Sequence, residues 1–366
     1  MPKTIVSIIS EQTIPNYLFI KEMFHPGDQL MFISSKKMCN RIEWIENALD
    51  WSLLNPQHVI LKKDGDEEDW GTMTSQIEKA LSEEDEYVVN LTGGTKYMAL
   101  AVQSVFSRHK SQFFYIPYPQ NQILSAKSES RPVTYRVSID EYTRLYNQPL
   151  RSAHEPLMPK AFTDKLFEAF IKGWEQDTWE IIDKLREYRN LKKSLPISAI
   201  ESADNGKLPR VAGLKSFLNQ ISFNHNGTLN GQQAQYLTGG WFEEFIYHRI
   251  KDILNPQNIM LGSKTSSTNN DLDVVFTLGN KLYVIECKTG VEGRGMLNEI
   301  VYKASALKEN LLGLSARSFI FSLGQDNEMW SQAAKNMGII YYGRSTFVDD
   351  NLFQCVMNAI RKSSFD

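Results

Sequence analysis

The segment Asp271–Gly290 reads DLDVVFTLGNKLYVIECKTG, and it contains two apolar runs separated by Gly279 and Asn280. A Gly-Asn pair between two such runs indicates a tight two-residue β-hairpin turn. Successive side chains of a strand point to opposite faces. Glu286 and Lys288 are therefore expected to share one face of the second strand, at the end of an otherwise apolar run.

Two carboxylates are expected to meet across this hairpin. Asp273 lies near the start of the first strand, and the short turn can bring it beside Glu286. A pair of carboxylates binds a hard divalent cation through oxygen, and such a cation polarises a phosphate and lowers the pKa of a bound water. Lys288 can orient that water or stabilise charge developing on phosphorus. The pattern predicts phosphodiester hydrolysis, against the alternative of an ordinary surface Glu–Lys pair.

This region offers two choices between neighbouring acids. Asp271 and Asp273 share a strand face, and we favour Asp273 because it lies deeper in the strand, beside the apolar run. The preceding segment TGGWFEEFIYHRI is expected to be a helix whose apolar face holds Trp241, Phe242, Phe245 and Ile246. Glu243 lies nearer the edge of that face than Glu244, so it is better placed to reach the carboxylates. The alternative is that both glutamates are solvated.

The first 125 residues alternate short β-branched runs with amphipathic stretches. We expect strands that start at Thr4, Gln29, His58, Glu86 and Gln112. Helical patterns lie between them, around residues 17–24, 41–53, 73–81 and 97–106. This alternation predicts a parallel, doubly wound α/β sheet of the Rossmann type, which binds ligands at the carboxyl ends of its strands. A last strand and short helix over residues 133–146 close the domain.

The segment Asn90–Lys96 reads NLTGGTK, follows one of these strands and opens a helix. Paired glycines let the backbone approach a ligand closely, and the amides of a helix N-terminus favour phosphate. The spacing is not that of a Walker A loop. The first two strands also end in polar residues, SEQT from Ser10 and SSKK from Ser34, so three strand ends form a rim suited to a polyanion. The alternative is a simple glycine turn capped by Thr95, with the lysines as surface charge.

The middle of the chain differs in character. Residues 147–160, NQPLRSAHEPLMPK, are rich in proline and polar side chains and are expected to form a linker. Helical patterns follow over residues 161–189 and 214–221, and a winged-helix-like spacer is one interpretation of them. Residues 224–233 form a second loop-rich boundary, after which strands and helices alternate again. We expect domains at 1–146, 147–232 and 233–366.

The composition is that of a folded protein, with 42% hydrophobic and 23% charged residues among 366 and a net charge of −3. This charge does not indicate nucleic-acid binding, although a nuclease needs only a local basic groove. The three cysteines are far apart and odd in number, which indicates a reducing cytoplasm and no disulfide framework. No Cys/His spacing fits a structural zinc site. No apolar stretch approaches the ~20 residues needed to span a bilayer, so we expect no membrane partner.

The hairpin segment resembles the PD-(D/E)xK nuclease signature, in which Asp is followed, after a gap, by Glu-x-Lys. The proline that usually precedes the first Asp is absent, and Asn270–Asp273 stand in its place. The NLTGGTK loop followed by the nuclease pattern resembles the CARF–nuclease effectors of type III CRISPR defence. The resemblance implies a CARF domain joined to a restriction-endonuclease-like α/β domain, in a homodimer.

The resemblance also implies roles for individual residues. The catalytic set would be Asp273, Glu286 and Lys288, with Glu243 as a further acid from the preceding helix. Asp273, Glu286 and the backbone carbonyl of Cys287 would hold Mn²⁺ or Mg²⁺. A cyclic oligoadenylate, often cyclic tetra-adenylate in that family, would bind the N-terminal domain and activate the nuclease. Its expected contacts are Ser10, Gln12, Thr13, Thr92, Gly93, Gly94, Thr95 and Lys96.

The resemblance leaves the substrate and two rival functions open. DNA, including single-stranded DNA, is the expected substrate, with RNA as an alternative. One rival is a constitutive repair or restriction nuclease whose N-terminal domain binds a different nucleotide. The other is a non-catalytic, nucleotide-sensing regulator that binds DNA through the helical middle. The intact set of Asp273, Glu286 and Lys288 argues against the regulator and does not bear on the constitutive nuclease.

Overall fold

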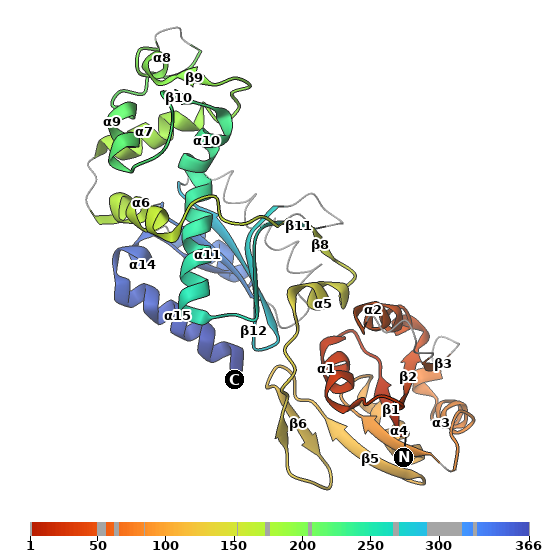
Figure 1. The fold of residues 1–366 in the computed structure, drawn as a ribbon. Coiled ribbons are helices and arrows are strands. Elements are labelled where there is room, and N and C mark those ends of the chain that lie inside the picture. Colours follow the sequence, from red (N-terminus) through yellow and green to blue (C-terminus); the bar gives the residue numbers. More distant parts are fainter. Residues whose placement is uncertain are drawn as a thin grey trace.

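The structure is a computed structural model that describes residues 2–49, 56–61, 66–83, 85–151, 153–172, 176–203, 207–265, 271–290, 317–324 and 328–365. Two domains, each built on a sheet, lie next to each other with helix α5 (Ile139–Arg144) between them (Figure 1). A group of short helices lies at the end of the second domain that faces away from the first (Figure 1). Among the described residues, no helix is long and apolar enough to cross a membrane.

The N-terminal sheet has seven strands in the order β3-β2-β1-β4-β5-β6-β7. The five parallel strands are β3 (Gln57–Leu61), β2 (Gln29–Ser35), β1 (Thr4–Ile8), β4 (Glu86–Asn90) and β5 (Lys110–Tyr115). The antiparallel strands β6 (Gln122–Ser125) and β7 (Arg131–Pro132) extend the sheet at one edge. The doubly wound parallel sheet expected from the sequence is confirmed.

Helices cover both faces of this sheet. One face packs on α1 (Ile14–Met23), α2 (Asn40–Leu49) and α5, and the other on α3 (Trp70–Glu78) and α4 (Lys96–Phe106). The alternation of side chains along β1 explains this, because Ile5 belongs to the first apolar cluster and Val6 to the second. The strand order reverses between β1 and β4, which is where such sheets bind ligands.

The C-terminal sheet has six strands in the order β15-β14-β13-β12-β11-β8. They are β15 (Ile340–Tyr342), β14 (Arg317–Ser322), β13 (Lys281–Lys288), β12 (Asp271–Leu278), β11 (Asn258–Thr265) and β8 (Leu150–Arg151). Strands β11, β12 and β13 are antiparallel, whereas β13, β14 and β15 are parallel. Strand β8 comes from the segment expected to be a linker, and it pairs with β11 at the edge of the sheet.

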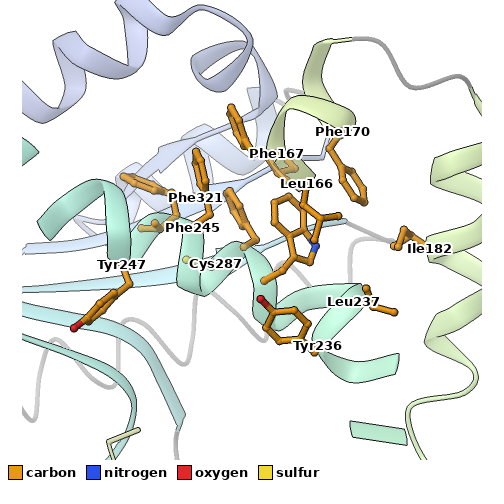
Figure 2. Close-up of a cluster of buried hydrophobic side chains, with 14 of the residues drawn as sticks. Leu166, Phe167, Phe170, Ile182, Tyr236, Leu237, Phe245, Tyr247, Cys287 and Phe321 are labelled. Carbon is orange, nitrogen blue, oxygen red and sulfur yellow. The ribbon is translucent and has the colours of Figure 1, made fainter. Parts of the chain in front are cut away.

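The helices of this second domain are α11 (Trp241–Leu254), α13 (Glu328–Asn336), α14 (Arg344–Val348) and α15 (Asp350–Phe365). Helix α6 (Lys160–Lys172), from the expected spacer, packs against α11. Phe167 stacks on Phe245 with ring centroids 4.1 Å apart, and Phe170 stacks on Trp241 at 4.9 Å. Figure 2 shows Phe167, Phe170 and Phe245 in one apolar cluster with Phe321 of β14. Trp241 belongs to the same cluster.

The helical module, residues 176–235, follows α6. It contains α7 (Gln176–Arg186), β9 (Leu195–Pro196), α8 (Ile197–Glu201), α9 (Leu214–Gln220), β10 (Thr228–Leu229) and α10 (Gly231–Gln235). Strands β9 and β10 form a two-stranded antiparallel sheet. In a winged-helix domain a β-hairpin, the wing, would follow the helices, whereas β10 leads directly into α10. Ile182 of this module and Leu237 beyond it belong to the same apolar cluster as side chains of the C-terminal sheet (Figure 2). The module and the C-terminal domain therefore share one core.

Candidate functional site

The β12–β13 hairpin turns at Gly279 and Asn280, whose φ angles are +59° and +63°. Both central residues of a type I′ turn need a positive φ, as the Gly-Asn pair predicts. The two strands pair for five consecutive steps from this turn. The next step in the register brings Asp273 opposite Glu286, so the hairpin aligns the two acids.

Asp273, Glu286 and Lys288 meet at the end of the hairpin away from the turn. The Asp273 carboxylate accepts a 2.7 Å hydrogen bond from the backbone N–H of Cys287. The Lys288 Nζ lies 2.7 Å from Glu286 Oε1 and 3.8 Å from Asp273 Oδ2. Both carboxylates are buried, whereas the lysine side chain is partly exposed. The expected trio is thus gathered around one ammonium group.

Asp271, the alternative first acid, lies outside this cluster. Its side chain is 62% exposed and forms an ion pair with Lys264 at 3.1 Å. Asp273 is only 8% exposed, because the strand enters the core just after Asp271. The structure therefore places Asp273, and not Asp271, beside Glu286 and Lys288, while the catalytic role of Asp273 stays a prediction.

The second choice concerned Glu243 and Glu244 of α11, and Glu244 is the buried one. Its carboxylate accepts hydrogen bonds from the backbone N–H groups of Leu157 and Met158 (2.5 and 3.2 Å) and from the Tyr236 hydroxyl (2.8 Å). Glu244 thus fixes the chain before α6 against α11. The alternative in which both glutamates are solvated is wrong for Glu244.

Glu243 lies within electrostatic range of the hairpin site. Burial raises the pKa of its carboxyl group, the positive charge of Lys288 lowers it and the negative charge of Glu286 raises it, with a net increase. Glu243 is therefore the glutamate near the predicted catalytic residues, as expected. The helical wheel gives only part of the reason, because the Glu244 carboxylate is also occupied by its hydrogen bonds to Leu157, Met158 and Tyr236.

The cluster contains three carboxyl groups, Asp273, Glu286 and Glu243, and one ammonium group, Lys288. The pKa of Asp273 is well above its usual value, mainly because the group is buried and also because Glu286 and Glu243 are negative; Lys288 and the N–H of Cys287 act in the opposite direction. Burial lowers the pKa of Lys288, but the charges of Asp273 and Glu286 outweigh this and raise it. One lysine does not neutralise three carboxyl groups.

This excess of carboxylate fits a divalent cation held by two side chains. Among the residues that the structure describes, no three His, Cys, Asp or Glu side chains form a group that could hold a metal ion. Mg²⁺ and similar cations are nevertheless often bound by one or two carboxylates, and water and substrate oxygens complete their coordination. Asp273 and Glu286 are the two suitable carboxylates. A contribution from the backbone carbonyl of Cys287 stays a prediction.

The turn of the same hairpin is bound by the N-terminal domain. Asn280 Nδ2 donates to Asn121 Oδ1 (2.7 Å) and to the Tyr135 carbonyl (3.1 Å). Asn280 Oδ1 accepts from the N–H of Val137 (2.8 Å), and its carbonyl accepts from the Tyr118 hydroxyl (2.9 Å). Sequence reasoning identified Asn280 only as a turn residue, because its partners lie more than a hundred residues away.

The NLTGGTK loop packs tightly against the end of β1. A Cβ added to Gly93 would lie 1.8 Å from the backbone oxygen of Ile8, and Gly94 has a φ of +72°. Only glycine fits the first position, and glycine is strongly favoured at the second. The paired glycines therefore bring the loop after β4 against the end of β1, at the point where the strand order reverses.

Buried polar side chains hold this loop in place. Asn16 Nδ2 donates to the Ile8 carbonyl, and Asn90 Nδ2 donates to Asn16 Oδ1, both at 3.1 Å. Asn90 Oδ1 accepts from the N–H and the hydroxyl of Thr92 at 3.0 and 2.5 Å. The Thr92 hydroxyl also accepts from the N–H of Ile116 at 2.7 Å. Thr92, a predicted ligand contact, is therefore bound within the domain.

The outer part of the loop is open. Thr95 caps α4 by accepting a 3.1 Å hydrogen bond from the N–H of Met98, and both Thr95 and Lys96 are exposed. Ser10 Oγ would lie 3.4 Å from a Cβ added to Gly93, so the first loop adjoins the second. Two predicted contacts, Thr95 and Lys96, thus face solvent where the first and fourth strands end.

Thr13, another predicted ligand residue, is also held within the domain. Its side chain is completely buried, and its hydroxyl donates to the Leu145 carbonyl at 2.7 Å. Ser10 and Gln12 are partly exposed, and the Ser10 hydroxyl donates to the Gln12 carbonyl at 3.2 Å. Thr13 therefore anchors the loop to the end of α5, while Ser10 and Gln12 remain candidates for ligand contact.

The fold and the site define a two-domain protein in which a doubly wound sheet precedes a mixed sheet with an Asp–Glu–Lys cluster. Residues 4–142 match the family model of the Card1 CARF domain, and residues 230–354 match that of the Card1-like endonuclease domain. The chain therefore combines a CARF domain of the Card1 type with a Card1-like endonuclease domain. No curated protein sequence matches it.

Solved structures share the fold over nearly the whole chain. Protein VC1899 from Vibrio cholerae is 17% identical with a TM-score of 0.77, and the match covers 99% of this chain and 98% of that one. Can2 from Sulfobacillus thermosulfidooxidans, solved in complex with cyclic tetra-adenylate, is 20% identical with a TM-score of 0.75 and coverages of 97% and 98%. A type III CRISPR defence DNA nuclease activated by cyclic oligoadenylate is 15% identical, with a TM-score of 0.57 and coverages of 93% and 50%.

Proposed function

We propose that the protein is a metal-dependent nuclease of type III CRISPR antiviral defence that is activated when a cyclic oligoadenylate binds its CARF domain. The observation that carries this proposal is the β12–β13 hairpin. Its turn is bound to the CARF domain through Asn280, and its opposite end carries Asp273 and Glu286. A shift of the CARF loops would therefore act on the strands that position the two acids.

The activator site that we propose is the rim formed by the loops after β1 and β4. The backbone amides at the N-terminus of α4 and the exposed Lys96 suit the phosphates of a cyclic oligoadenylate. Ser10, Gln12 and Thr95 add polar groups at the same rim. Can2 binds cyclic tetra-adenylate in a structure of the same fold, so this ring is the first activator to test.

A homodimer is supported by an apolar patch next to this rim. The α3–α4 patch consists of Trp70, Tyr97 and Leu100, which are 38%, 42% and 57% exposed. Trp70 and Tyr97 contact each other edge to face, with centroids 5.4 Å apart. A two-fold axis through this patch would bring two NLTGGTK loops to one cyclic ligand. Exposed apolar patches often mark such interfaces.

The chemistry that we propose uses the hairpin cluster. Asp273 and Glu286 would hold Mn²⁺ or Mg²⁺, which polarises a phosphate and supplies an activated water when bound. Lys288, held by Glu286, can donate to a phosphate oxygen as negative charge develops. Glu243 adds a third acid beside this pair. DNA is the first substrate to test, in double- and single-stranded form, and RNA is the alternative.

The decisive experiment incubates the purified protein with plasmid, single-stranded DNA or RNA. Each substrate is tested with and without each cyclic oligoadenylate, in Mn²⁺, in Mg²⁺ and in a chelator. We expect cleavage only when activator and metal are both present. Cleavage without activator would instead indicate a constitutive nuclease. Nucleic-acid binding without cleavage under every condition would indicate a regulator.

A further inference from the structure

Two arginines of the helical module lie near the end of β13, the strand that carries Glu286 and Lys288. Arg186 is the last residue of α7, and its Nη2 donates to the Thr289 hydroxyl at 3.2 Å. A Cβ added to Gly290 would lie 2.6 Å from the same nitrogen, so the guanidinium lies against the backbone at the end of β13. Thr289 directly follows Lys288. The module therefore places a permanent cation next to the predicted catalytic strand end.

The second arginine, Arg189, binds the turn before α11. Its Nε donates to the Thr238 hydroxyl at 2.6 Å and its Nη2 to the Thr238 carbonyl at 2.9 Å. Thr238 lies in a π-helical turn, Tyr236–Gly240, and such turns occur frequently at functional sites. The Thr289 hydroxyl donates to the same carbonyl at 2.6 Å. Arg189 thus ties the module to the turn before α11, the helix that carries Glu243, and the Thr238 carbonyl that it binds also holds Thr289 at the end of β13.

The two guanidinium groups differ in what they can offer a ligand. Arg189 is half-buried and makes its hydrogen bonds to neutral acceptors of Thr238. Arg186 is 23% exposed, and its ionic partner is Asp183, which is 55% exposed, at 3.2 Å. Exposed ion pairs of this kind contribute little free energy. A phosphate can therefore replace Asp183 as the partner of Arg186 without a large penalty.

The charges around the site explain why an arginine is needed there. Carboxyl groups that ionise in this cluster repel the phosphates of a nucleic acid, and Lys288 is already paired with Glu286. A positive group beside the cluster can draw the substrate backbone past these acids. Guanidinium matches phosphate with two parallel hydrogen bonds.

We propose that Arg186 binds a backbone phosphate of the substrate strand next to the one that is cleaved. Arg189 is a positioning residue that holds the turn before α11. The helical module is then part of the substrate site and not only a spacer between two domains. This inference rests on the proposed nuclease function.

The test measures DNA binding by the full-length protein with saturating cyclic tetra-adenylate, in Ca²⁺ to suppress cleavage. The probe is a labelled single-stranded DNA, titrated over a series of salt concentrations. Arg186→Ala is expected to weaken binding about tenfold and to lower the slope of log K against log salt by about one. Arg186→Lys, which keeps the charge, should retain the slope. Lys184→Ala is the matched control, because Lys184 lies on the same helix and pairs with Glu180.

Cleavage kinetics in Mn²⁺ separate substrate binding from positioning. Arg186→Ala should raise KM and leave kcat close to that of the wild type. An unchanged salt slope, or a loss of kcat with unchanged DNA binding, overturns the proposal. Arg186→Ala could unfold at a lower temperature than the wild type. In that case the slope of log K against log salt is measured for Arg186→Gln, which can still donate to Thr289, and that slope tests the proposal. If the wild type binds and cleaves no nucleic acid, the nuclease function itself is wrong.

Discussion

The side-chain nitrogen of Asn280 donates a 2.7 Å hydrogen bond to Oδ1 of Asn121, and this bond joins the turn of the nuclease hairpin to the CARF domain. Asn121 Nδ2 in turn donates to the Gly279 carbonyl at 2.8 Å. Both asparagines are buried. A buried amide that loses its partner costs free energy, so this contact couples the position of the turn to that of the CARF loop.

Asn280→Gly removes the side-chain contacts and keeps the turn, because glycine accepts the φ of +63°. We expect a loss of about 1–3 kcal/mol in the free energy of unfolding, from unsatisfied buried partners. Activator binding should stay near that of the wild type, while cleavage at saturating activator falls. Urea unfolding, calorimetric titration of the activator and cleavage assays measure the three quantities.

Asn255→Gly is the control for this variant. Asn255 also has a positive φ, at the C-terminal end of α11, and it is exposed. It should leave activation unchanged. Normal activation of Asn280→Gly would show that the hairpin turn does not transmit activator binding.

Asp273→Asn and Asp271→Asn form a matched pair on one strand. Asp273→Asn should reduce cleavage by about a hundredfold or more, because a metal ligand is lost, whereas Asp271→Asn should cleave normally. The raised pKa of Asp273, caused mainly by burial, means that its ionised form is disfavoured in the folded apoprotein. Asp273→Asn should therefore keep or raise the unfolding temperature without metal. Normal cleavage by this variant would reassign the first acid.

Lys96→Ala tests the activator rim. A charge-assisted contact in a partly desolvated site contributes roughly 2–4 kcal/mol, and a two-fold dimer would lose two of them. Activator affinity should therefore fall more than about a hundredfold, and cleavage should recover at saturating activator. Lys288→Ala should show the opposite, with normal activator affinity and no cleavage.

The control for the rim is Lys110→Ala, since Lys110 is exposed at the opposite end of the parallel strands. Activator titrations that record binding and cleavage separately compare all three variants. Normal activator binding by Lys96→Ala would place the ligand elsewhere.

Leu100→Lys tests the α3–α4 patch. A two-fold axis places the substituted residue of both subunits in the same apolar interface, so Leu100→Lys buries two charges there. We therefore expect the dimer to dissociate and the affinity for the activator to fall. Multi-angle light scattering with and without activator measures the mass. Leu157→Lys is the control, because Leu157 is 72% exposed and lies outside the patch. A wild-type protein that is monomeric in both conditions would contradict the dimer.

The parts of the molecule that local patterns determine could be predicted from the sequence. The positive φ angles of Gly279 and Asn280 follow from a two-residue turn between apolar runs. The close approach of Gly93 to β1 follows from paired glycines between a strand and a helix. In both cases neighbouring residues fix the geometry.

Contacts between distant segments could not be predicted in this way. Arg186 reaches Thr289 across a hundred residues of chain, and its position in an amphipathic helix carries no sign of that contact. Glu244 is buried because Leu157 and Met158 offer it backbone N–H groups, which a helical wheel does not show. The sequence predicts that the Thr13 hydroxyl contacts a ligand, whereas it donates to the carbonyl of Leu145 at the end of α5.

The position of β8 in the C-terminal sheet determines where a different CARF domain can be joined to this endonuclease domain. A fragment that begins at residue 233 would lack both β8 and α6, and it would expose the faces of Trp241 and Phe245 that α6 covers. Burial of each such aromatic ring contributes about 1.5–3 kcal/mol, so that fragment should aggregate. A foreign sensor domain must therefore be fused before Leu150, so that β8, α6 and the helical module stay with the endonuclease.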